Sequence, residues 1–220
     1  MADSFNNIGV VYAGKGDHEN ALVQHQKALE IRTRVFGSDH LDVAASYNNI
    51  GNIYDTQGKY EEALDYYQKS LDIKIRVVGD NHPDVAASYN NIGNIYDRQG
   101  KYEEALDYYQ KSLDIKIRVV GDNHPDVAKS YTGIGGVYYS QGQYERALEY
   151  YQKGLEIDIK VSGQDHPDVA ASKENKGLVF KKMTKKSEAR QMFTEAAGIR
   201  RKVLGADHPL TKKSERLAAQ

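Results

Sequence analysis

Apolar residues along this chain recur at the spacing of one face of a helix, and two such stretches form one hairpin. In residues 42–58 the spaced positions are Tyr47, Ile50, Gly51, Tyr54 and Gly58, at intervals i, i+3, i+4, i+7 and i+11. A second stretch, between residues 60 and 78, has its stripe at Tyr60, Ala63, Leu64, Tyr67, Leu71 and Val78. The pattern predicts two helices separated by the turn at Gln57-Gly58-Lys59. In the recurring pair Tyr66-Tyr67 we expect Tyr67 in the core and Tyr66 between neighbouring hairpins.

The residues around these stripes are typical of helix ends. Gly58 suits the left-handed position that closes a helix, and Gly79 ends the second helix. Pro83 suits the first helical position, where no backbone N–H is needed, and Asp84 suits the positive end of the helix dipole. Gly51 lies inside a helix, where glycine costs roughly 1 kcal/mol against alanine. Its recurrence therefore predicts that the second helix of the same hairpin passes close to it.

The hairpin repeats with a period of 42 residues. Residues 84–125 copy residues 42–83, except that Thr56 becomes Arg98. The markers of the period are His82, His124, His166 and His208, together with Gly9, Gly51, Gly93, Gly135 and Gly177. A fixed period of this length indicates a solenoid of stacked repeats. We predict one array over residues 1–220, with repeats 1–41, 42–83, 84–125, 126–167 and 168–207 and a polar helix in 208–220 that covers the last repeat.

The order of aromatic, small and glycine residues resembles the tetratricopeptide repeat. The match lies in Tyr47, Ile50, Gly51, Tyr54, Ala63 and Tyr67. The usual repeat has about 34 residues, whereas this longer form, closed by Gly-x-x-His-Pro, is similar to the repeats of kinesin light chains. The resemblance implies an all-α fold: a right-handed superhelical solenoid of antiparallel helix pairs, with five repeats and a C-terminal helix. It also implies a scaffold or adaptor for protein–protein interaction that recruits cargo or partners as kinesin light chains do, and not an enzyme.

The resemblance further implies that the first helices line a concave groove, and asparagine dominates the positions that would face it. The candidate groove residues are Asn6, Asn7, Asn48, Asn49, Asn52, Asn90, Asn91, Asn94, Arg98, Lys129, Thr132, Tyr139, Asn175, Lys181 and Lys182. An asparagine amide both donates and accepts hydrogen bonds, so a series of them can hold an extended peptide by its backbone. The same side chains can instead bridge neighbouring helices, and one residue can do both.

The fourth repeat predicts where specificity lies. It keeps the apolar positions of the second repeat, but all six of its groove positions differ. Gly133 and Gly136 remove bulk beside Tyr139, which predicts a side-chain pocket, and Lys181 and Lys182 make the groove cationic toward the fifth repeat. We therefore expect the groove to bind an extended or short helical segment with acidic residues and one aromatic or large apolar anchor.

The net charge of −1 hides an asymmetry along the chain. Residues 1–167 carry 17 Lys and Arg against 25 Asp and Glu, whereas residues 168–220 carry 13 against 6. Solvated helix faces can explain this drift. The sharper interpretations are an acidic partner at the basic end, or self-association through oppositely charged terminal repeats. A further alternative is a sensor or regulatory region within a larger multidomain signalling protein.

Composition and spacing disfavour other chemistry. The chain has no cysteine, no apolar run long enough to span a membrane and no signal peptide, so we expect a cytoplasmic protein without membrane partners. The spaced histidines would lie on the order of 10 Å apart, which is too far for a shared metal, so we assign them to turns. The basic run at residues 181–186 follows acidic repeats, which argues against nucleic acid. No motif predicts a cofactor.

Overall fold

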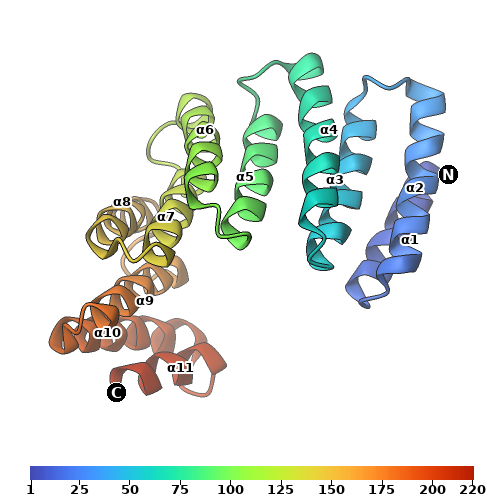
Figure 1. Cartoon of the computed structure of the whole chain (residues 1–220). Coiled ribbons are helices and arrows are strands. Elements are labelled where there is room, and N and C mark those ends of the chain that lie inside the picture. Colours follow the sequence, from blue (N-terminus) through green and yellow to red (C-terminus); the bar gives the residue numbers. More distant parts are fainter. The chain divides into compact units, whose positions relative to one another are not determined.

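The structure, a computed structural model, describes residues 1–220 and contains eleven α-helices and no strand (Figure 1). The helices are α1 (Ala2–Gly14), α2 (His18–Phe36), α3 (Leu41–Thr56), α4 (Tyr60–Val78), α5 (Pro83–Arg98), α6 (Tyr102–Val120), α7 (Pro125–Ser140), α8 (Tyr144–Ser162), α9 (Pro167–Lys182), α10 (Lys186–Leu204) and α11 (Pro209–Ala218). Successive helices pack as pairs, such as α3 on α4 and α7 on α8, which confirms the all-α solenoid of helix pairs. The chain divides inside α6 into an N-terminal unit, Met1–Ile115, and a C-terminal unit, Lys116–Gln220, and each is described by itself.

Histidine rings cap the first helices from the second repeat onward. The Nδ1 atom of His82 accepts a hydrogen bond from the backbone N–H of Asp84 at 3.2 Å, and His124 does the same for Asp126. The equivalent caps of α3, α9 and α11 are His40, His166 and His208. The ring nitrogen takes the role that a Ser or Asp oxygen has at most helix starts. The turn role predicted for the spaced histidines is therefore confirmed.

The turn between the two helices of a repeat contains a glycine with a positive φ in every repeat except the fifth. The φ angle is 72° at Gly58, which adopts the left-handed conformation that the sequence predicts, and Gly79 ends α4 with a φ of 80°. In the fifth repeat, Thr184 stands where the other repeats have a glycine such as Gly142, and its φ is 61°. Because a β-branched side chain is strained in this region, the turn between α9 and α10 stores strain that the other turns avoid.

The glycines inside the first helices receive a ring from the second helix of the same repeat. A Cβ atom on Gly51 would lie 2.8 Å from the Tyr67 ring and 3.4 Å from the backbone oxygen of Ala63. The same contact recurs at Gly9–His25, Gly93–Tyr109, Gly135–Tyr151 and Gly177–Phe193. The predicted close approach is confirmed, and a ring fills the space in all five repeats: an imidazole in the first and a tyrosine or phenylalanine ring in the other four.

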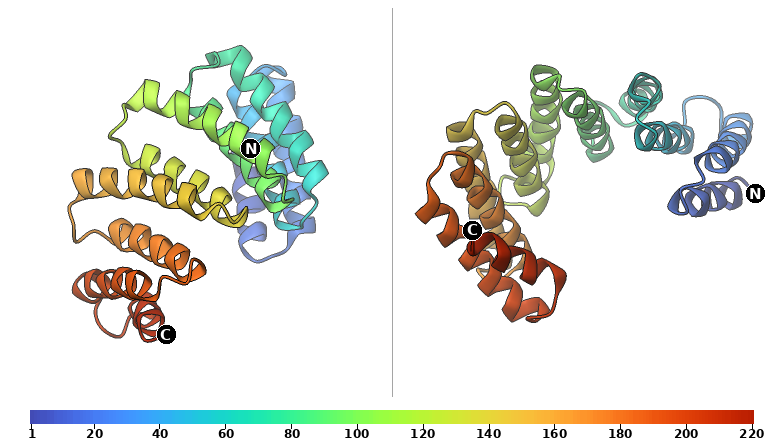
Figure 2. Two further views of the ribbon diagram at one scale, coloured as in Figure 1. Left: turned by 60° about the vertical axis from the view of Figure 1, so that its left-hand side comes forward. Right: turned by 60° about the horizontal axis from the view of Figure 1, so that its bottom comes forward.

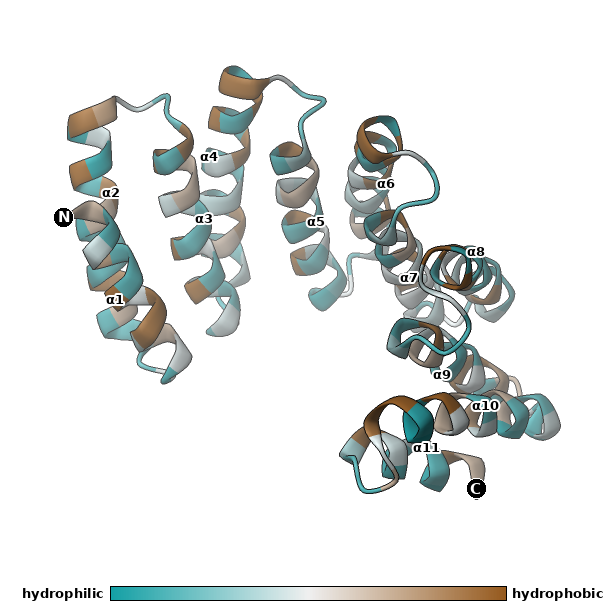
Figure 3. Cartoon of the chain, turned by 180° about the vertical axis from the view of Figure 1, so that it is seen from behind, coloured by the Kyte–Doolittle hydropathy of each residue, from teal (hydrophilic) through white to brown (hydrophobic).

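The second helices bury more residues than the single apolar stripe that the sequence predicts. The Tyr66 ring lies 5.4 Å from the Tyr54 ring of the same repeat, measured between centroids, so the prediction that Tyr66 packs between neighbouring repeats is wrong. Adjacent helical residues lie about 100° apart, so a broad contact with α3 reaches both Tyr66 and Tyr67. Ser70 and Ile73 are also buried, at positions the apolar pattern did not mark. Figure 3 shows apolar and polar segments alternating within the helices.

A polar contact at the same position of every repeat joins each second helix to the following first helix. Lys74 donates to the Ser88 hydroxyl at 2.8 Å in the N-terminal unit, and Lys116 donates to Ser130 at 2.8 Å in the C-terminal unit. The remaining members of the series are Arg32 with Ser46, Asp158 with Ser172, and Arg200 with Ser214. Only Asp158 reverses the polarity, because there the serine donates. The last contact belongs to α11, which lies beside α10 in both views of Figure 2 and therefore packs as a further first helix.

Candidate functional site

The asparagines of the N-terminal unit form a ladder across the first helices. The Asn49 amide of α3 donates to the Asn6 side-chain oxygen of α1 at 2.9 Å. The Asn91 amide of α5 repeats this contact with Asn48 of α3 at 3.0 Å. These two rungs show that the asparagines bridge neighbouring helices. In each unit, we call the surface formed by its own candidate groove residues the first-helix face of that unit.

Two further asparagines accept a hydrogen bond from a tyrosine hydroxyl of the second helix in the same repeat. The Tyr67 hydroxyl donates to the Asn52 side-chain oxygen at 2.7 Å, and the Tyr109 hydroxyl donates to Asn94 at 2.6 Å. Burial raises the pKa of both tyrosines far above the usual range, so the hydroxyls stay protonated and keep donating. The amide NH₂ groups of Asn52 and Asn94 form no hydrogen bond within the protein.

Asn7 and Asn90 make no side-chain hydrogen bond within the protein. Asn7 is exposed and Asn90 is half-buried. Each has a full amide, with two donors and acceptor positions, available to a ligand. The first-helix face of the N-terminal unit therefore combines asparagines that hold the helices together with asparagines that are uncommitted.

The single difference between the second and third repeats also lies on this face. Arg98 forms an ion pair with Asp55 of the preceding repeat, whereas the Thr56 hydroxyl donates to the backbone oxygen of Ile53 at 2.8 Å. The Asp55 side chain is only 15% exposed. Arg98 thus links α5 to α3, so part of its charge is compensated inside the protein.

In the C-terminal unit the candidate residues have partners of their own. The Lys129 amine lies 3.5 Å from an Asp126 carboxylate oxygen. Burial raises the pKa of Asp158, and the positive charge of Lys129 counters this effect, so Lys129 also neighbours that carboxyl. The Tyr139 ring lies 5.9 Å from the Tyr144 ring and packs against the buried cluster of Ala147, Tyr151 and Val179. Thr132 and Asn175 are half-buried.

The space predicted in the fourth repeat is open at one of its two glycines. A Cβ atom on Gly133 would meet no atom within 4 Å, whereas one on Gly136 would lie 3.8 Å from the Tyr151 hydroxyl oxygen. A side-chain pocket at this place stays a prediction.

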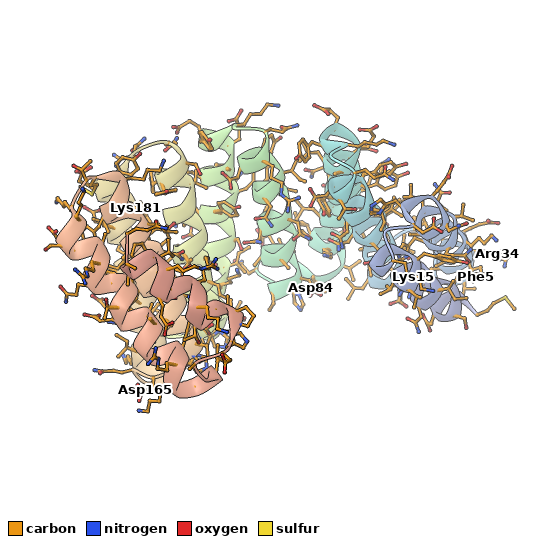
Figure 4. All side chains as sticks on the ribbon, turned by 90° about the horizontal axis from the view of Figure 1, so that it is seen from below. Phe5, Lys15, Arg34, Asp84, Asp165 and Lys181 are labelled. Carbon is orange, nitrogen blue, oxygen red and sulfur yellow. The ribbon has the colours of Figure 1, made fainter.

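The basic residues on the first-helix face of the C-terminal unit lie at the C-terminus of α9. Lys181 and Lys182 occupy its last turn, and Figure 4 shows Lys181 and Asp165 near opposite ends of this helix. Lys181 donates to the side-chain oxygen of Gln220, while Lys182 makes no ion pair. Glu174, on the same helix, is buried and bound by Arg200, so its negative charge is already neutralised.

A cavity of 210 Å³ lies beside these lysines, between α9, α10 and α11. Its lining consists of Lys181, Thr184, Lys186, Ala189, Arg190, Phe193, Leu217 and Gln220. Sequence reasoning missed it because Thr184 and Lys186 belong to the basic run at residues 181–186, and Leu217 and Gln220 belong to the helix predicted to cover the last repeat. The available signal was the exchange of Tyr144 and Leu148 of the fourth repeat for Lys186 and Arg190 in the fifth.

The chain matches one known family along most of its length. The family model described as Tetratricopeptide repeat matches residues 1–76, 56–118, 84–160 and 126–202. The chain is a tetratricopeptide repeat protein. No curated protein sequence matches it. As a tetratricopeptide repeat protein it belongs to a family of protein-interaction modules that are in general non-catalytic, and none of its helices is long and apolar enough to cross a membrane.

Solved structures define the type of repeat. BtubC (BKLC) from P. vanneervenii shares 25% identity at a TM-score of 0.81, covering 94% of this chain and 82% of that one. The kinesin light chain of Podosopora anserina with nearly identical TPR-like repeats shares 20% identity at 0.78, covering 91% and 95%. YrrB, a TPR protein with an unusual peptide-binding site, shares 20% at 0.56, covering 98% and 92%. The kinesin-light-chain-like type of the repeats is thereby confirmed.

Proposed function

We propose that this tetratricopeptide repeat protein is a non-catalytic scaffold that binds an extended or short helical protein segment on its first-helix face. The observation that carries the proposal is the asparagine series, in which Asn7 and Asn90 are uncommitted and Asn52 and Asn94 keep free NH₂ groups. By recruiting such segments, the protein would act as an adaptor for cargo or partners, as its kinesin-light-chain-like repeats suggest.

The spacing of the series suits a peptide main chain. Packed helices lie roughly 8–10 Å apart, and an extended chain advances about 3.3 Å per residue. One step from first helix to first helix therefore corresponds to about three residues of extended ligand. Amides that both donate and accept can bind the N–H and C=O groups of any sequence, so the ladder supplies affinity and leaves selectivity to neighbouring side chains.

The charge of the C-terminal repeats supports selectivity for acidic segments. Residues 168–220 carry 13 Lys and Arg against 6 Asp and Glu, and Lys182 has no carboxylate partner. Like charges on one surface repel each other, so a negatively charged ligand relieves this repulsion. That YrrB, a TPR protein, has a peptide-binding site supports the class of ligand.

The test is a peptide-display selection on the whole chain, followed by binding of the selected peptides to Asn7→Ala/Asn90→Ala. This variant removes amides that stabilise nothing in the free protein, so its thermal unfolding should match that of the parent chain. Loss of two hydrogen bonds of about 0.5–1.5 kcal/mol each predicts binding weaker by about fivefold or more. The matched control is Gln26→Ala/Gln164→Ala, two exposed amides outside the first-helix face. Enrichment of basic or purely aliphatic peptides, or unchanged binding by the asparagine variant, would refute the proposal.

Self-association is the second candidate, and a specific observation favours it. Ile8 is 44% and Val11 56% exposed on α1, whereas their equivalents Ile50 and Ile53 in α3 are 0% and 4% exposed. An apolar face of this kind, together with the charge asymmetry, could pair two copies end to end. Light scattering at increasing protein and salt concentration tests it, and a monomer at every condition excludes it.

A further inference from the structure

We propose that the cavity between α9, α10 and α11 is a pocket for one apolar side chain of an acidic protein segment, with carboxylates on both sides of that side chain. The inference rests on the proposed function and deepens it, because it places the apolar anchor in the fifth repeat.

The fifth repeat has lost the residues that fill the equivalent space elsewhere. Tyr144 and Leu148 of the fourth repeat pack against a core cluster that includes buried Tyr151. The second and third repeats have the same residues there, Tyr60 and Leu64, then Tyr102 and Leu106. The fifth repeat has Lys186 and Arg190 at these positions, and both are exposed. Two packing side chains have thus been exchanged for two cations, and a cavity remains in their place.

The cavity has the size and the floor of a site for one side chain. Ala189, Phe193 and Leu217 supply its apolar lining. Its volume of 210 Å³ lies below the roughly 300–1,000 Å³ of sites that enclose a whole small molecule. A leucine-sized or phenylalanine-sized side chain is therefore a better occupant than a free metabolite.

Three cations surround this floor without a carboxylate partner. Lys186 and Arg190 make no ion pair, and Lys181 donates only to the neutral amide of Gln220. Glu188 is two residues from both Lys186 and Arg190 on α10, and residues at that spacing do not face each other. Lys186 is the first residue of α10, where the positive end of the helix dipole adds to its charge. An anion bound here would relieve this repulsion.

Backbone strain is located at the same place. Thr184 lines the cavity and is the one non-glycine residue with a positive φ in the chain. Strained residues that persist where an unstrained one is available cluster at functional sites, and glycine fills this position in the other four repeats. The threonine brings a methyl group and a hydroxyl to the rim, which a glycine would not supply.

The experiment is fluorescence polarisation of a labelled Gly-Glu-Glu-Leu-Glu-Glu-Gly peptide on the whole chain. Lys186→Tyr/Arg190→Leu restores the residues of the fourth repeat, fills the pocket and should fold at least as well as the parent. Lys186→Gln/Arg190→Gln removes the charge and leaves the cavity open. Lys185→Gln/Arg216→Gln removes two exposed charges, each next in sequence to a lining residue but outside the cavity lining, and is the matched control.

We expect the filled and the uncharged variants to bind about tenfold or more weakly, and the control to bind within about threefold of the parent. A peptide with Ala in place of Leu should bind about tenfold or more weakly, since burial of a leucine side chain accounts for that factor. Salt should weaken binding of the parent peptide and not of its Gln counterpart. Equal losses in the filled variant and the control, equal binding of the Ala peptide, or no binding at all would overturn the pocket.

The asparagine variant separates this inference from the proposed function. If display-selected peptides depend on Asn7 and Asn90 but not on Lys186 and Arg190, the pocket fails and the first-helix face stands. If the Glu-Glu-Leu-Glu-Glu peptide depends on Lys186 and Arg190 but not on the two asparagines, the pocket stands and the ladder does not bind peptide.

Discussion

Replacement of Arg200 by methionine should detach the C-terminal helix from the array. The Arg200 guanidinium binds the Glu174 carboxylate of α9, the Ser214 hydroxyl of α11 and, at 3.4 Å, the backbone oxygen of Leu210. The side chains of Arg200 and Glu174 are only 7% and 6% exposed. Lys213 of α11 donates to the other Glu174 oxygen at 2.6 Å. Arg200→Met keeps the aliphatic part of the side chain and removes the group that joins three helices.

The magnitude follows from the burial of the carboxylate. Burial alone disfavours the charged form of Glu174, but hydrogen bonds from Lys213 and Arg200 outweigh it and hold the pKa below its usual range. The variant therefore leaves a buried anion at neutral pH. Removing one partner of a buried pair costs about 3–5 kcal/mol, and because Lys213 remains we expect the lower end, about 3 kcal/mol. That corresponds to roughly 100-fold in the opening equilibrium of α11.

Hydrogen exchange is the suitable assay because repeat arrays open locally from their ends. Protection of the amides in α11 should fall roughly 100-fold in Arg200→Met, while α3 and α4 stay unchanged. The matched control is Arg201→Met: Arg201 also pairs with α11, through Glu215 at 2.5 Å, but the two side chains are 63% and 36% exposed. An exposed pair contributes about 0.2–1 kcal/mol, so protection should fall less than about fivefold.

An equal fall of α11 protection in Arg200→Met and Arg201→Met would contradict the role of burial in this ion pair. Equal losses would mean that contact with α11 matters and burial does not. Unchanged protection in Arg200→Met would mean that α11 is held by its apolar contacts alone.

Three further predictions concern single side chains. Burial, and then the Arg32 charge, lower the pKa of His25. The His25 contribution to the stability of the first repeat is therefore complete above pH 6.5 and falls as the pH drops below it, by at most about 1.4 kcal/mol per pH unit. Hydrogen exchange of α1 at pH 7 and pH 5 measures this, and the same pH dependence in His25→Phe would contradict it. His82→Ala should lower the free energy of unfolding by about 1 kcal/mol, because the hydrogen bond from the Asp84 N–H to the His82 ring is lost. His82→Ser, whose hydroxyl can also cap the helix, should keep most of that stability. Equal thermal unfolding of the parent protein and both variants would contradict the capping role. Thr184→Gly should stabilise the fifth repeat by about 0.5–1 kcal/mol, because relief of about 1–2 kcal/mol of left-handed strain exceeds the entropy cost of glycine. Weaker hydrogen-exchange protection of α10 in this variant would show that Thr184 is not strained.

Local features could be predicted from the sequence because they depend on neighbours along the chain. The turn glycine Gly58, the first-turn Pro83 and the helix-starting His82 act within a few residues, and the structure has them where the sequence predicts. Gly51 was also informative, because its period implied a close neighbour and Tyr67 is that neighbour.

Candidate residues of the site were harder to assign, because sequence spacing does not say which groups meet. The asparagines admitted two roles, and the rung from Asn49 to Asn6 joins residues 43 apart. Arg98 was expected to serve a ligand, yet it pairs with Asp55 of the preceding repeat. The direction of these side chains depends on how far one repeat is displaced against the next, and no short-range rule contains that displacement.

The sequence by itself determined the helices, their ends, the period of 42 residues and the family resemblance, because hydrophobic periodicity and capping are short-range effects repeated along the chain. Only the tertiary structure decided which polar groups are already occupied and which are free. It placed Glu174 in a buried ion pair, left Asn7 and Asn90 without partners and opened a cavity beside Lys186. Those outcomes depend on the distances and the burial between helices. Helix packing determines both, and the order of residues along one helix does not.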